Sequence, residues 1–297
     1  LRRAGVPRAD WTICSTEYRG HARALAEAAA REGSPVRIFA AGGDGTFNEA
    51  LTGARPYPNA AVGCIPTGSG NDFLRTFGSK AEFLDLDAQL AGGVISIDLM
   101  ETGLGLSASV CAAGLDAQVA AGAARYRHNP LFHGEAAYLL SAGREICGPL
   151  GRRARFTVDG ETFEADILMC AACNTRDYGG GFRAAPAAQP DDGLIDLVVV
   201  RRMSRFTLLR LLNLYKQGRH FAGGQLAPGL ARYLIYRRAR EITVELTDGR
   251  GPITATADGE CAQVSRLDIR LLPGAARVVL PASACRRRQT ESCPANI

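Results

Sequence analysis

Lysine is almost absent from this chain of 297 residues, since Lys80 and Lys216 are the only lysines among 35 basic residues. Neither lysine follows a glycine, which excludes the G-x-x-x-x-G-K-[ST] loop that many proteins use to hold nucleotide phosphates. Histidine is also scarce, and none of the four histidines pairs with a nucleophile in a recognisable arrangement. We therefore expect the histidines to pack or to lie on the surface, not to catalyse.

The chain also lacks an apolar run of the roughly 20 residues that cross a membrane, and it shows no signal-peptide pattern. Any contact with a membrane is therefore expected at the membrane surface. The net charge of +5 is small and scattered, and aromatic residues do not alternate with a basic patch. We therefore expect no nucleic-acid partner.

The nine cysteines have no spacing typical of a disulfide framework, and most of them lie in apolar runs. This pattern favours a reduced, cytoplasmic compartment. The single C-x-x-C, Cys170 to Cys173, has no second pair and no histidine nearby. Buried strand cysteines are therefore favoured over a metal or redox site.

The composition, with 46% hydrophobic and 22% charged residues, is that of a globular protein, and the length favours two domains. Up to about residue 100, helix and strand signals alternate, which is typical of a parallel sheet with flanking helices. Such sheets bind ligands at the carboxyl ends of their strands. The expected helices span residues 20–33, 47–54, 71–78 and 80–93, and the expected strands span 35–43, 59–66 and 94–100.

Beyond this point the signals are mainly those of antiparallel strands, interrupted by two helices. Asp159-Gly160 has the composition of a two-residue hairpin turn, and Ser204 is the expected N-cap of the second helix. We therefore predict a nucleotide-binding α/β domain over residues 1–98 and a β-sandwich over 99–283. We expect the polar tail, 284–297, to fray or to return to the first domain. The expected strands are 105–119, 153–174, 193–200, 240–246, 253–262 and 266–272, and the expected helices are 133–148 and 204–221.

The stretch "AAGGDGTFNEALTG", residues 40–53, contains three glycines around one acid at the end of an expected strand. Backbone N–H groups without Cβ obstruction can wrap phosphate oxygens, and a helix expected to start near Thr46 adds its positive end. Asp44 would repel phosphate unless a divalent cation lay between them, so the loop indicates a nucleotide with its metal. The alternative is a tight strand-to-helix turn capped by Asp44.

A second loop, "IPTGSGNDFLR" at residues 65–75, repeats this design. It adds Asp72 at the same expected sheet edge, and Asp98 ends the next expected strand. Three carboxylates on neighbouring parallel strands could hold a hydrated Mg²⁺. The alternative is that each acid is a solvated cap.

Four ordered motifs, "GGDGTFNEA", "IPTGSGNDFLR", "NTRDYGGGFRAAPAAQPDDGLIDL" and "TADGE", closely resemble the catalytic domain of the diacylglycerol kinase and sphingosine kinase family, especially its soluble bacterial lipid kinases. The resemblance implies a Rossmann-like nucleotide domain with a parallel sheet, a C-terminal antiparallel β-sandwich, and an active site in the cleft between them. It also implies transfer of the γ-phosphate of ATP, with Mg²⁺, to a lipid hydroxyl, most simply that of diacylglycerol, at the membrane surface. A homodimer is compatible with it.

The resemblance also implies roles for single residues. Glu260 matches the general base that takes the proton from the lipid hydroxyl, although a hairpin position after Asp258-Gly259 is the alternative. Asp44, Asp72 and Asp98 match the acids that organise catalytic Mg²⁺. A structural Mg²⁺ site is implied at the Asp192 side chain and the Gln189 and Leu194 carbonyls. The implied nucleotide contacts are Thr16, Gly42, Gly43, Asp44, Gly45, Thr46, Asn48, Gly68, Ser69 and Asn71, where Ser69 replaces the usual threonine.

One departure concerns the start of the chain, because the family usually begins with a strand and an Asn-Pro-x-Ser/Ala-Gly turn that this sequence does not show. The expected sheet is thus short of its first strand and of part of its phosphate grip. Two alternatives to a lipid kinase remain open at this point. One is a kinase for a soluble acceptor, as in the NAD kinases, which share GGDGT; the other is an inactive module that binds nucleotide or lipid.

Overall fold

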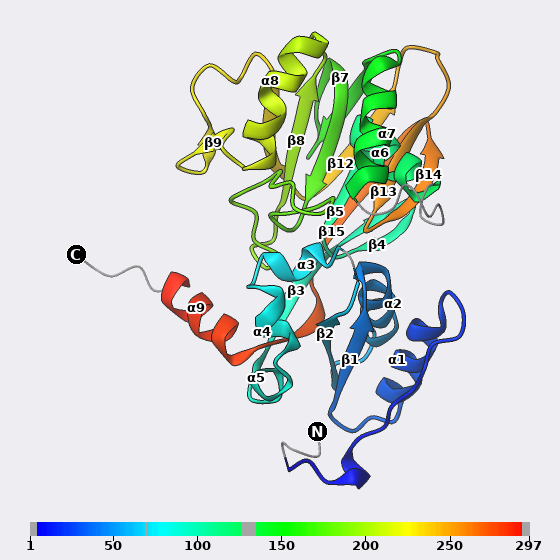
Figure 1. The fold of residues 1–297 in the computed structure, drawn as a ribbon, viewed down its shortest axis with the longest axis vertical. Coiled ribbons are helices and arrows are strands. Elements are labelled where there is room, and N and C mark those ends of the chain that lie inside the picture. The colour runs from blue at the N-terminus through cyan, green and yellow to red at the C-terminus, as the bar shows by residue number, and fades with distance from the viewer. Residues whose placement is uncertain (1–4, 69, 126–134, 293–297) are drawn as a thin grey trace, which may run out of the picture. The chain divides into compact units, whose positions relative to one another are not determined.

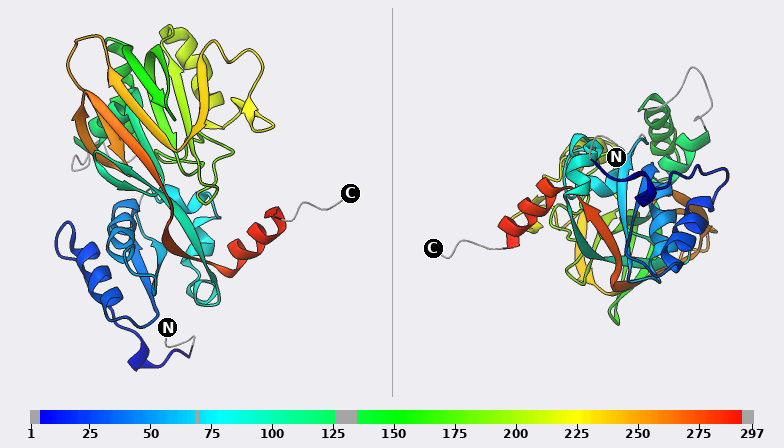
Figure 2. Two further views of the ribbon diagram at one scale, coloured as in Figure 1. Left: turned by 180° about the vertical axis from the view of Figure 1, so that it is seen from behind. Right: turned by 90° about the horizontal axis from the view of Figure 1, so that it is seen from below.

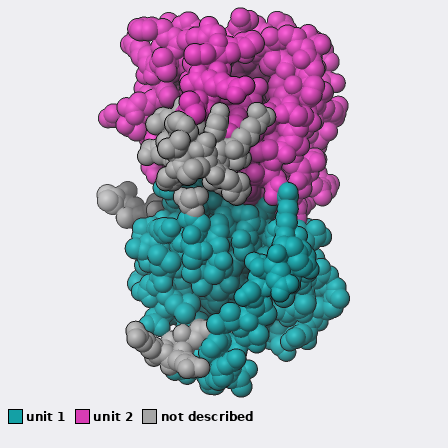
Figure 3. Space-filling model, turned by 45° about the vertical axis from the view of Figure 1, so that its right-hand side comes forward, with its two compact units in different colours: residues 1–97, 274–297 teal, residues 98–273 magenta. Residues whose placement is uncertain are grey.

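The computed structural model describes residues 5–68, 70–125 and 135–292. These residues form two compact units, which Figure 3 distinguishes by colour. Unit 1 comprises residues 1–97 and 274–297, and unit 2 comprises residues 98–273. Strands β3 (Gly93–Thr102) and β15 (Arg266–Leu280) run through both units.

Unit 1 is built on a parallel sheet. Strand β1 (Val36–Gly42) pairs in parallel with β2 (Ala60–Pro66), and β2 pairs in parallel with the last part of β15. The register of β1 and β2 places Gly42 opposite Pro66, so both strands end at the same edge of the sheet. Because the two glycine-rich loops follow these strand ends, the sheet itself brings the loops together.

Helices α1 (His21–Arg31) and α2 (Asp44–Ala54) lie on one side of these strands, and α4 (Lys80–Leu84) and α5 (Leu86–Leu90) lie on the other (Figures 1 and 2). Helix α2 begins at Asp44, two residues before the expected start. Residues 284–292 of the polar tail, which was expected to fray or to return to the first domain, lie in α9, and α9 groups with unit 1. The remaining elements of this unit are η1 (Arg8–Asp10), α3 (Asp72–Arg75) and α9 (Ala282–Ser292).

Side chains on α9 explain why the tail is helical. The Ser283 hydroxyl and the Arg287 guanidinium both donate to Oε1 of Glu82, each at 2.6 Å. Three donors from Ser79, Ser283 and Arg287, led by Arg287, lower the pKa of Glu82 to about 2. A polar segment that looks unstructured by composition is thus fixed by a contact some 200 residues away in sequence.

Unit 2 is a mainly antiparallel β structure, as expected. The expected strand over 105–119 ends at Gly114, where a helix follows instead. The helices are α6 (Leu115–Arg125), α7 (Glu135–Cys147) and α8 (Arg205–Lys216), which Ser204 caps as predicted. The strands are β4 (Gly105–Ser107), β5 (Val110–Gly114), β6 (Arg152–Val158), β7 (Glu161–Cys173), β8 (Ile195–Arg201), β9 (Phe221–Ala222), β10 (Gln225–Leu226), β11 (Leu234–Ala239), β12 (Glu241–Leu246), β13 (Ile253–Ala257) and β14 (Glu260–Val264).

Strands β5, β7 and β8 are buried on both faces. Successive side chains of a strand point to opposite sides of the sheet, so each of these strands contributes to two cores. On β8, Leu197 and Val199 belong to a core formed with the other strands, whereas Val198 and Val200 belong to a core formed with α6 and α8. The helices face the viewer in Figure 1, and β12 and β15 come forward when the molecule is turned round (Figure 2). Two cores on one sheet give unit 2 its sandwich-like layers.

The cysteines of the C-x-x-C motif point to opposite faces of β7. Cys170 lies in the core between strands and Cys173 in the core under the helices. Burial raises the pKa of both thiols, and all eight cysteines in the described part of the chain are free. The prediction of buried strand cysteines is therefore confirmed.

A tight contact between α1 and α2 gives a test of this packing. A Cβ added to Gly53 on α2 would collide with the backbone carbonyl oxygen of Arg23 on α1, whereas one added to Gly143 on α7 would meet nothing within 4 Å. We expect Gly53→Ala to destabilise the protein by about 1–3 kcal/mol through overpacking, and Gly143→Ala to stabilise it by up to about 1 kcal/mol. Urea unfolding followed by circular dichroism measures both changes. Equal midpoints for the two variants would contradict the packing described.

Candidate functional site

The two glycine-rich loops of unit 1 are packed directly against each other. The backbone N–H groups of Thr67 and Gly68 both donate to the Gly42 carbonyl, each at 3.1 Å. A Cβ on Gly68 would lie 2.5 Å from the Cα of Gly43. Glycine at position 68 is therefore required by the close approach of two backbones, a requirement that the protein itself imposes.

Asp44 joins the loops through its carboxylate. Oδ2 accepts the N–H of Asn71 at 2.6 Å, and Oδ1 accepts the N–H of Asp72 at 2.8 Å. Asn71 is buried in the left-handed conformation, with φ 60°, and its side chain donates to the Gly42 carbonyl at 3.0 Å. Asp44 therefore does act as a cap, as in the alternative interpretation of its loop. The N–H groups that it caps, however, lie at the start of α3, in the other loop.

Gly45 differs from its neighbours. It is exposed, its φ is not positive, and a Cβ there would meet nothing within 4 Å. Neither strain nor packing within the described residues explains the glycine. It lies in the first turn of α2, where backbone N–H groups have no partner within the helix and the helix dipole is positive. This position is suited to an incoming anion.

The other expected nucleotide contacts are distributed around this turn. The Thr46 side chain packs against Gly42, where a Cβ would lie 2.5 Å from the Thr46 Oγ1. Asn48 is half-buried on α2, and Thr16 is exposed in the segment before α1. The predicted role of Ser69 falls on a residue outside those that the structure describes.

The expected acids belong to both units. Asp72 pairs with Arg75 at 3.3 Å in unit 1. Asp98, which lies within β3 and not at its end, belongs to unit 2, where its Oδ2 accepts the Gly193 N–H at 2.8 Å. Its backbone carbonyl accepts the Asn174 side chain at 2.8 Å. No group of three or more His, Cys, Asp or Glu side chains placed to hold a metal occurs in the described ranges.

The structural Mg²⁺ site that the resemblance implies would fall on the turn at residues 189–194. Asp192 Oδ1 accepts the Leu194 N–H at 3.1 Å, and its other oxygen is paired with the guanidinium of Arg238. Burial raises the pKa of Asp192 and of the neighbouring Asp196, whose carboxylate accepts the Tyr236 hydroxyl. Arg238 supplies positive charge to this acidic turn. Gln189 is exposed.

Glu260 is exposed at the start of β14, directly after the turn formed by Asp258 and Gly259. The φ values of this turn, 46° and 92°, are close to those of the Asp159-Gly160 turn, 46° and 88°, so both predicted hairpins are confirmed. The aspartates of both turns accept backbone N–H groups, and the Asp159 carboxylate accepts those of Arg240 and Glu241 at 2.9 and 2.8 Å. The Asp258 carboxylate accepts four donors from β4, the loop after it and the start of β5: the Ser107 hydroxyl at 2.9 Å and the N–H groups of Ala108, Ser109 and Val110 at 2.6–3.1 Å.

These contacts fix the hairpin that carries Glu260, and sequence reasoning did not find them. Asp258 is half-buried, and each donor lies about 150 residues away in sequence. A carboxylate that accepts several backbone N–H groups is held in one orientation. The residue two positions further on is therefore presented from a rigid support.

Unit 2 also contains an apolar cavity of about 330 Å³ between α8, α6 and the sheet. Among the described residues its wall is mainly aliphatic, and Asp116 is the one acid that lines it. The Tyr178 hydroxyl donates to Asp116 Oδ2 at 2.8 Å, and burial raises the pKa of this carboxyl to about 6. The apolar residues of this wall are not distinguishable from ordinary core residues in the sequence, so no site was predicted here.

Comparison with known proteins covers both units. The model described as the diacylglycerol kinase catalytic domain matches residues 1–102, and the one described as the YegS C-terminal NAD kinase beta sandwich-like domain matches residues 109–280. A diacylglycerol kinase of Mycobacterium tuberculosis is 31% identical over 268 residues, which cover 88% of this chain and 81% of that protein. A probable YegS-like lipid kinase of Pseudomonas aeruginosa is 30% identical over 268 residues, covering 89% and 83%.

A solved structure of a putative diacylglycerol kinase from Bacillus anthracis superposes with a TM-score of 0.69 at 22% identity, over 90% of this chain and 85% of that one. This likeness supports the fold. The fold and these matches define the class of protein. It is a kinase with an α/β unit and a β-sandwich-like unit. The chain belongs to the diacylglycerol kinase family, which includes the YegS-like lipid kinases.

The raised pKa of Asp116 predicts a pH effect on stability. Because its folded pKa, about 6, exceeds the ordinary value of 3.8, the protonated acid stabilises the folded state at low pH. This contribution is lost as the pH rises from about 4 to 6, by at most about 3 kcal/mol. We expect Asp116→Asn, which keeps an acceptor for Tyr178, to be more stable relative to the wild type at pH 7.5 than at pH 4.5. Parallel pH profiles in urea unfolding would contradict this assignment.

Proposed function

We propose that this protein transfers the γ-phosphate of ATP to a lipid hydroxyl, with diacylglycerol or a related lipid as acceptor. The observation that carries the proposal is Gly45, an exposed glycine with an ordinary backbone conformation and no packing neighbour, in the first turn of α2. A phosphate group fits this position, because it can approach the backbone N–H groups without meeting a Cβ. The relatives named as diacylglycerol kinases and lipid kinases support the choice of acceptor.

The apolar cavity of unit 2 supports an acceptor with hydrocarbon chains. Its aliphatic wall can take apolar surface out of water, which stabilises binding by about 25 cal/mol per Å² buried. A dinucleotide acceptor, as in the alternative of an NAD kinase-like enzyme, would gain little from such a wall. The proposed enzyme is cytoplasmic and works at the membrane surface. No helix among the described residues is long and apolar enough to cross a bilayer.

We assign the triphosphate to the turn from Gly42 to Asn48, with Gly68, Ser69, Asn71 and Thr16 as further nucleotide contacts. The turn is rigid, because the Asp44 carboxylate and the Asn71 side chain hold both loops. A rigid set of donors stabilises charge in the transition state without reorganising during the reaction.

Mg²⁺ fits the acids that start α2 and α3. Each oxygen of Asp44 accepts one N–H group, and a carboxylate offers about four lone-pair sites in total, so acceptor capacity remains. When bound, Mg²⁺ would offset phosphate charge during transfer. We assign Asp44 and Asp72 to this ion together with Asp98, and the Asp192 side chain with the Gln189 and Leu194 carbonyls to a structural ion, where Arg238 already balances part of the charge.

Glu260 is the proposed general base. A carboxylate can accept the proton of a lipid hydroxyl as its oxygen attacks the γ-phosphate. The donors that fix Asp258 hold the turn before Glu260, so its backbone position does not depend on the acceptor. In this mechanism the chain positions the phosphate and the base, and the chemistry is carried mainly by electrostatic stabilisation.

The chain provides a matched control for this base, because the same tripeptide, Asp-Gly-Glu, forms both hairpins. We expect Glu260→Gln to lower the rate of labelled phosphate transfer from ATP to dispersed diacylglycerol by about 10²–10⁴-fold. Glu161→Gln, at the same place in the other hairpin, is expected to leave the rate unchanged. Both substitutions remove one charge from an exposed position, so the comparison isolates the role of the base.

The acceptor is tested in the same assay. Labelled product in the lipid phase supports the proposal, whereas transfer to NAD and not to lipid would favour the NAD kinase-like alternative. Binding of ATP without transfer to either acceptor would favour an inactive module. Equal rates for the Glu260 and Glu161 variants would remove Glu260 from the mechanism.

A further inference from the structure

Positive charge is concentrated in one segment of unit 2. Residues 197–240 contain ten arginines and lysines and neither an aspartate nor a glutamate. The whole chain has a net charge of +5, so the remaining residues are acidic in balance. The segment comprises most of β8, all of α8, and the strands β9 to β11. A segment of a single sign in a protein of mixed charge indicates an anionic partner.

Helix α8 adds exposed apolar side chains to this segment. It buries Leu208 and Tyr215 against the sheet, whereas Phe206 is 79% exposed and Leu209 is 57% exposed on its outer side. Leu212, 37% exposed, extends this outer side by one turn. An exposed phenylalanine next to exposed leucines on a helix without acids is not explained by folding of the unit alone.

A wide pocket of about 900 Å³ opens at the N-terminal end of α8. Of the residues that the structure describes, five arginines line it, with Asp166 as the only acid. Neither ion pairs nor side-chain hydrogen bonds occupy Arg201, Arg202 or Arg232 in the described part of the chain, and the buried Nε of Arg201 has no acceptor. The Arg232 guanidinium stacks on the Tyr233 ring at 4.6 Å, a contact that leaves its charge uncompensated. The other two arginines of the pocket are Arg205 and Arg250.

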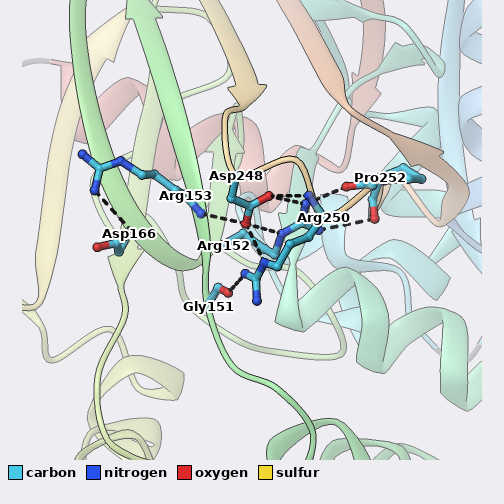
Figure 4. Close-up of polar contacts among 8 residues, drawn as sticks. Gly151, Arg152, Arg153, Asp166, Asp248, Arg250 and Pro252 are labelled. Carbon is cyan, nitrogen blue, oxygen red and sulfur yellow. Dashed lines mark hydrogen bonds and ion pairs between the residues drawn. The ribbon is translucent and has the colours of Figure 1, made fainter.

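Those two arginines are already used within the protein. Arg205 donates to the carbonyls at the end of α7, and Arg250 pairs with Asp248, which also forms a bidentate pair with Arg152 (Figure 4). The Arg152 guanidinium holds the pKa of Asp248 well below its usual range. Asp248 is therefore neutralised by its own partners, and the charge of Arg201, Arg202 and Arg232 remains available to a ligand.

We propose that the outer side of α8 and the arginine pocket at its start form a docking face for a bilayer that contains anionic lipids. This proposal rests on the proposed function and names the surface that brings the enzyme to its substrate. Aromatic and aliphatic side chains enter the boundary between head groups and acyl chains, while the arginines bind lipid phosphates. Charge complementarity selects this partner, because the described residues of the face offer several cations and apolar groups against a single acid, Asp166.

Sedimentation with vesicles tests the docking face on the full chain. The vesicles contain phosphatidylcholine alone or with added phosphatidylglycerol, at low and at high salt. Each basic residue near an anionic surface strengthens binding about fivefold. We therefore expect the double variant Arg202→Gln/Arg232→Gln to bind the anionic vesicles at least tenfold more weakly, and Phe206→Ser to weaken binding further.

Matched controls lie outside the face. Arg266→Gln/Arg270→Gln removes two exposed arginines of β15, and Leu84→Ser removes an exposed leucine of unit 1. Both controls are expected to bind as the wild type does. Failure of the wild type to bind anionic vesicles would overturn the docking face, as would equal loss in the docking variants and the controls.

Phosphate transfer to a short-chain diacylglycerol that is dispersed in water separates this proposal from the function. Phe206 and the two pocket arginines are assigned no part in that reaction, so their variants are expected to keep the wild-type rate. Vesicle binding that depends on these residues without any lipid phosphorylation would retain the docking face and reject the function. Normal phosphorylation together with vesicle binding that does not depend on these residues would retain the function and reject the docking face.

Discussion

The bond between the Asp44 carboxylate and the backbone of the neighbouring loop is the interaction on which unit 1 depends. Parallel pairing of β1 and β2 brings the two strand ends together, but it does not fix the loops that follow. Asp44 does so, because its two oxygens take the N–H groups of Asn71 and Asp72. Glycine at position 68 then allows the loop backbones to touch. What is left open by this arrangement is the first turn of α2 at Gly45.

Unit 2 is governed by a different constraint, the burial of one sheet on both faces. Alternate residues of β8 supply two cores, and the core beneath α6 and α8 contains an apolar cavity. The same sheet anchors the hairpin of Glu260 through Asp258. An apolar cavity, a fixed carboxylate and a basic helix surface thus occur in one unit, and each matches a different requirement of the proposed lipid acceptor.

Much of the fold follows from local sequence signals. Alternating helices and strands, the two Asp-Gly turns and the Ser204 cap depend on neighbouring residues, and these predictions are confirmed. The glycine loops were also recognised correctly as loops after strands. The glycines of these loops, however, are explained differently. Gly68 is required by a close backbone contact, whereas no contact within the described residues requires Gly45.

Features that depend on distant partners could not be predicted. The sequence around Asp258 does not reveal that its carboxylate accepts backbone N–H groups of residues 108–110. The polar composition of α9 does not reveal that its side chains donate to Glu82. The sequence around Asp98 likewise does not reveal that its N–H donates to the Pro190 carbonyl and that its carboxylate accepts the Gly193 N–H. Such contacts are set by tertiary packing, which periodicity and composition do not encode.

The central claim is that ATP phosphates bind at the open first turn of α2. Amide resonances followed by nuclear magnetic resonance during titration with a non-hydrolysable ATP analogue and Mg²⁺ test it most directly. The account predicts that the amides of Gly45 and Thr46 shift most and become protected from hydrogen exchange. Saturable binding of the analogue that leaves both amides unchanged would contradict it.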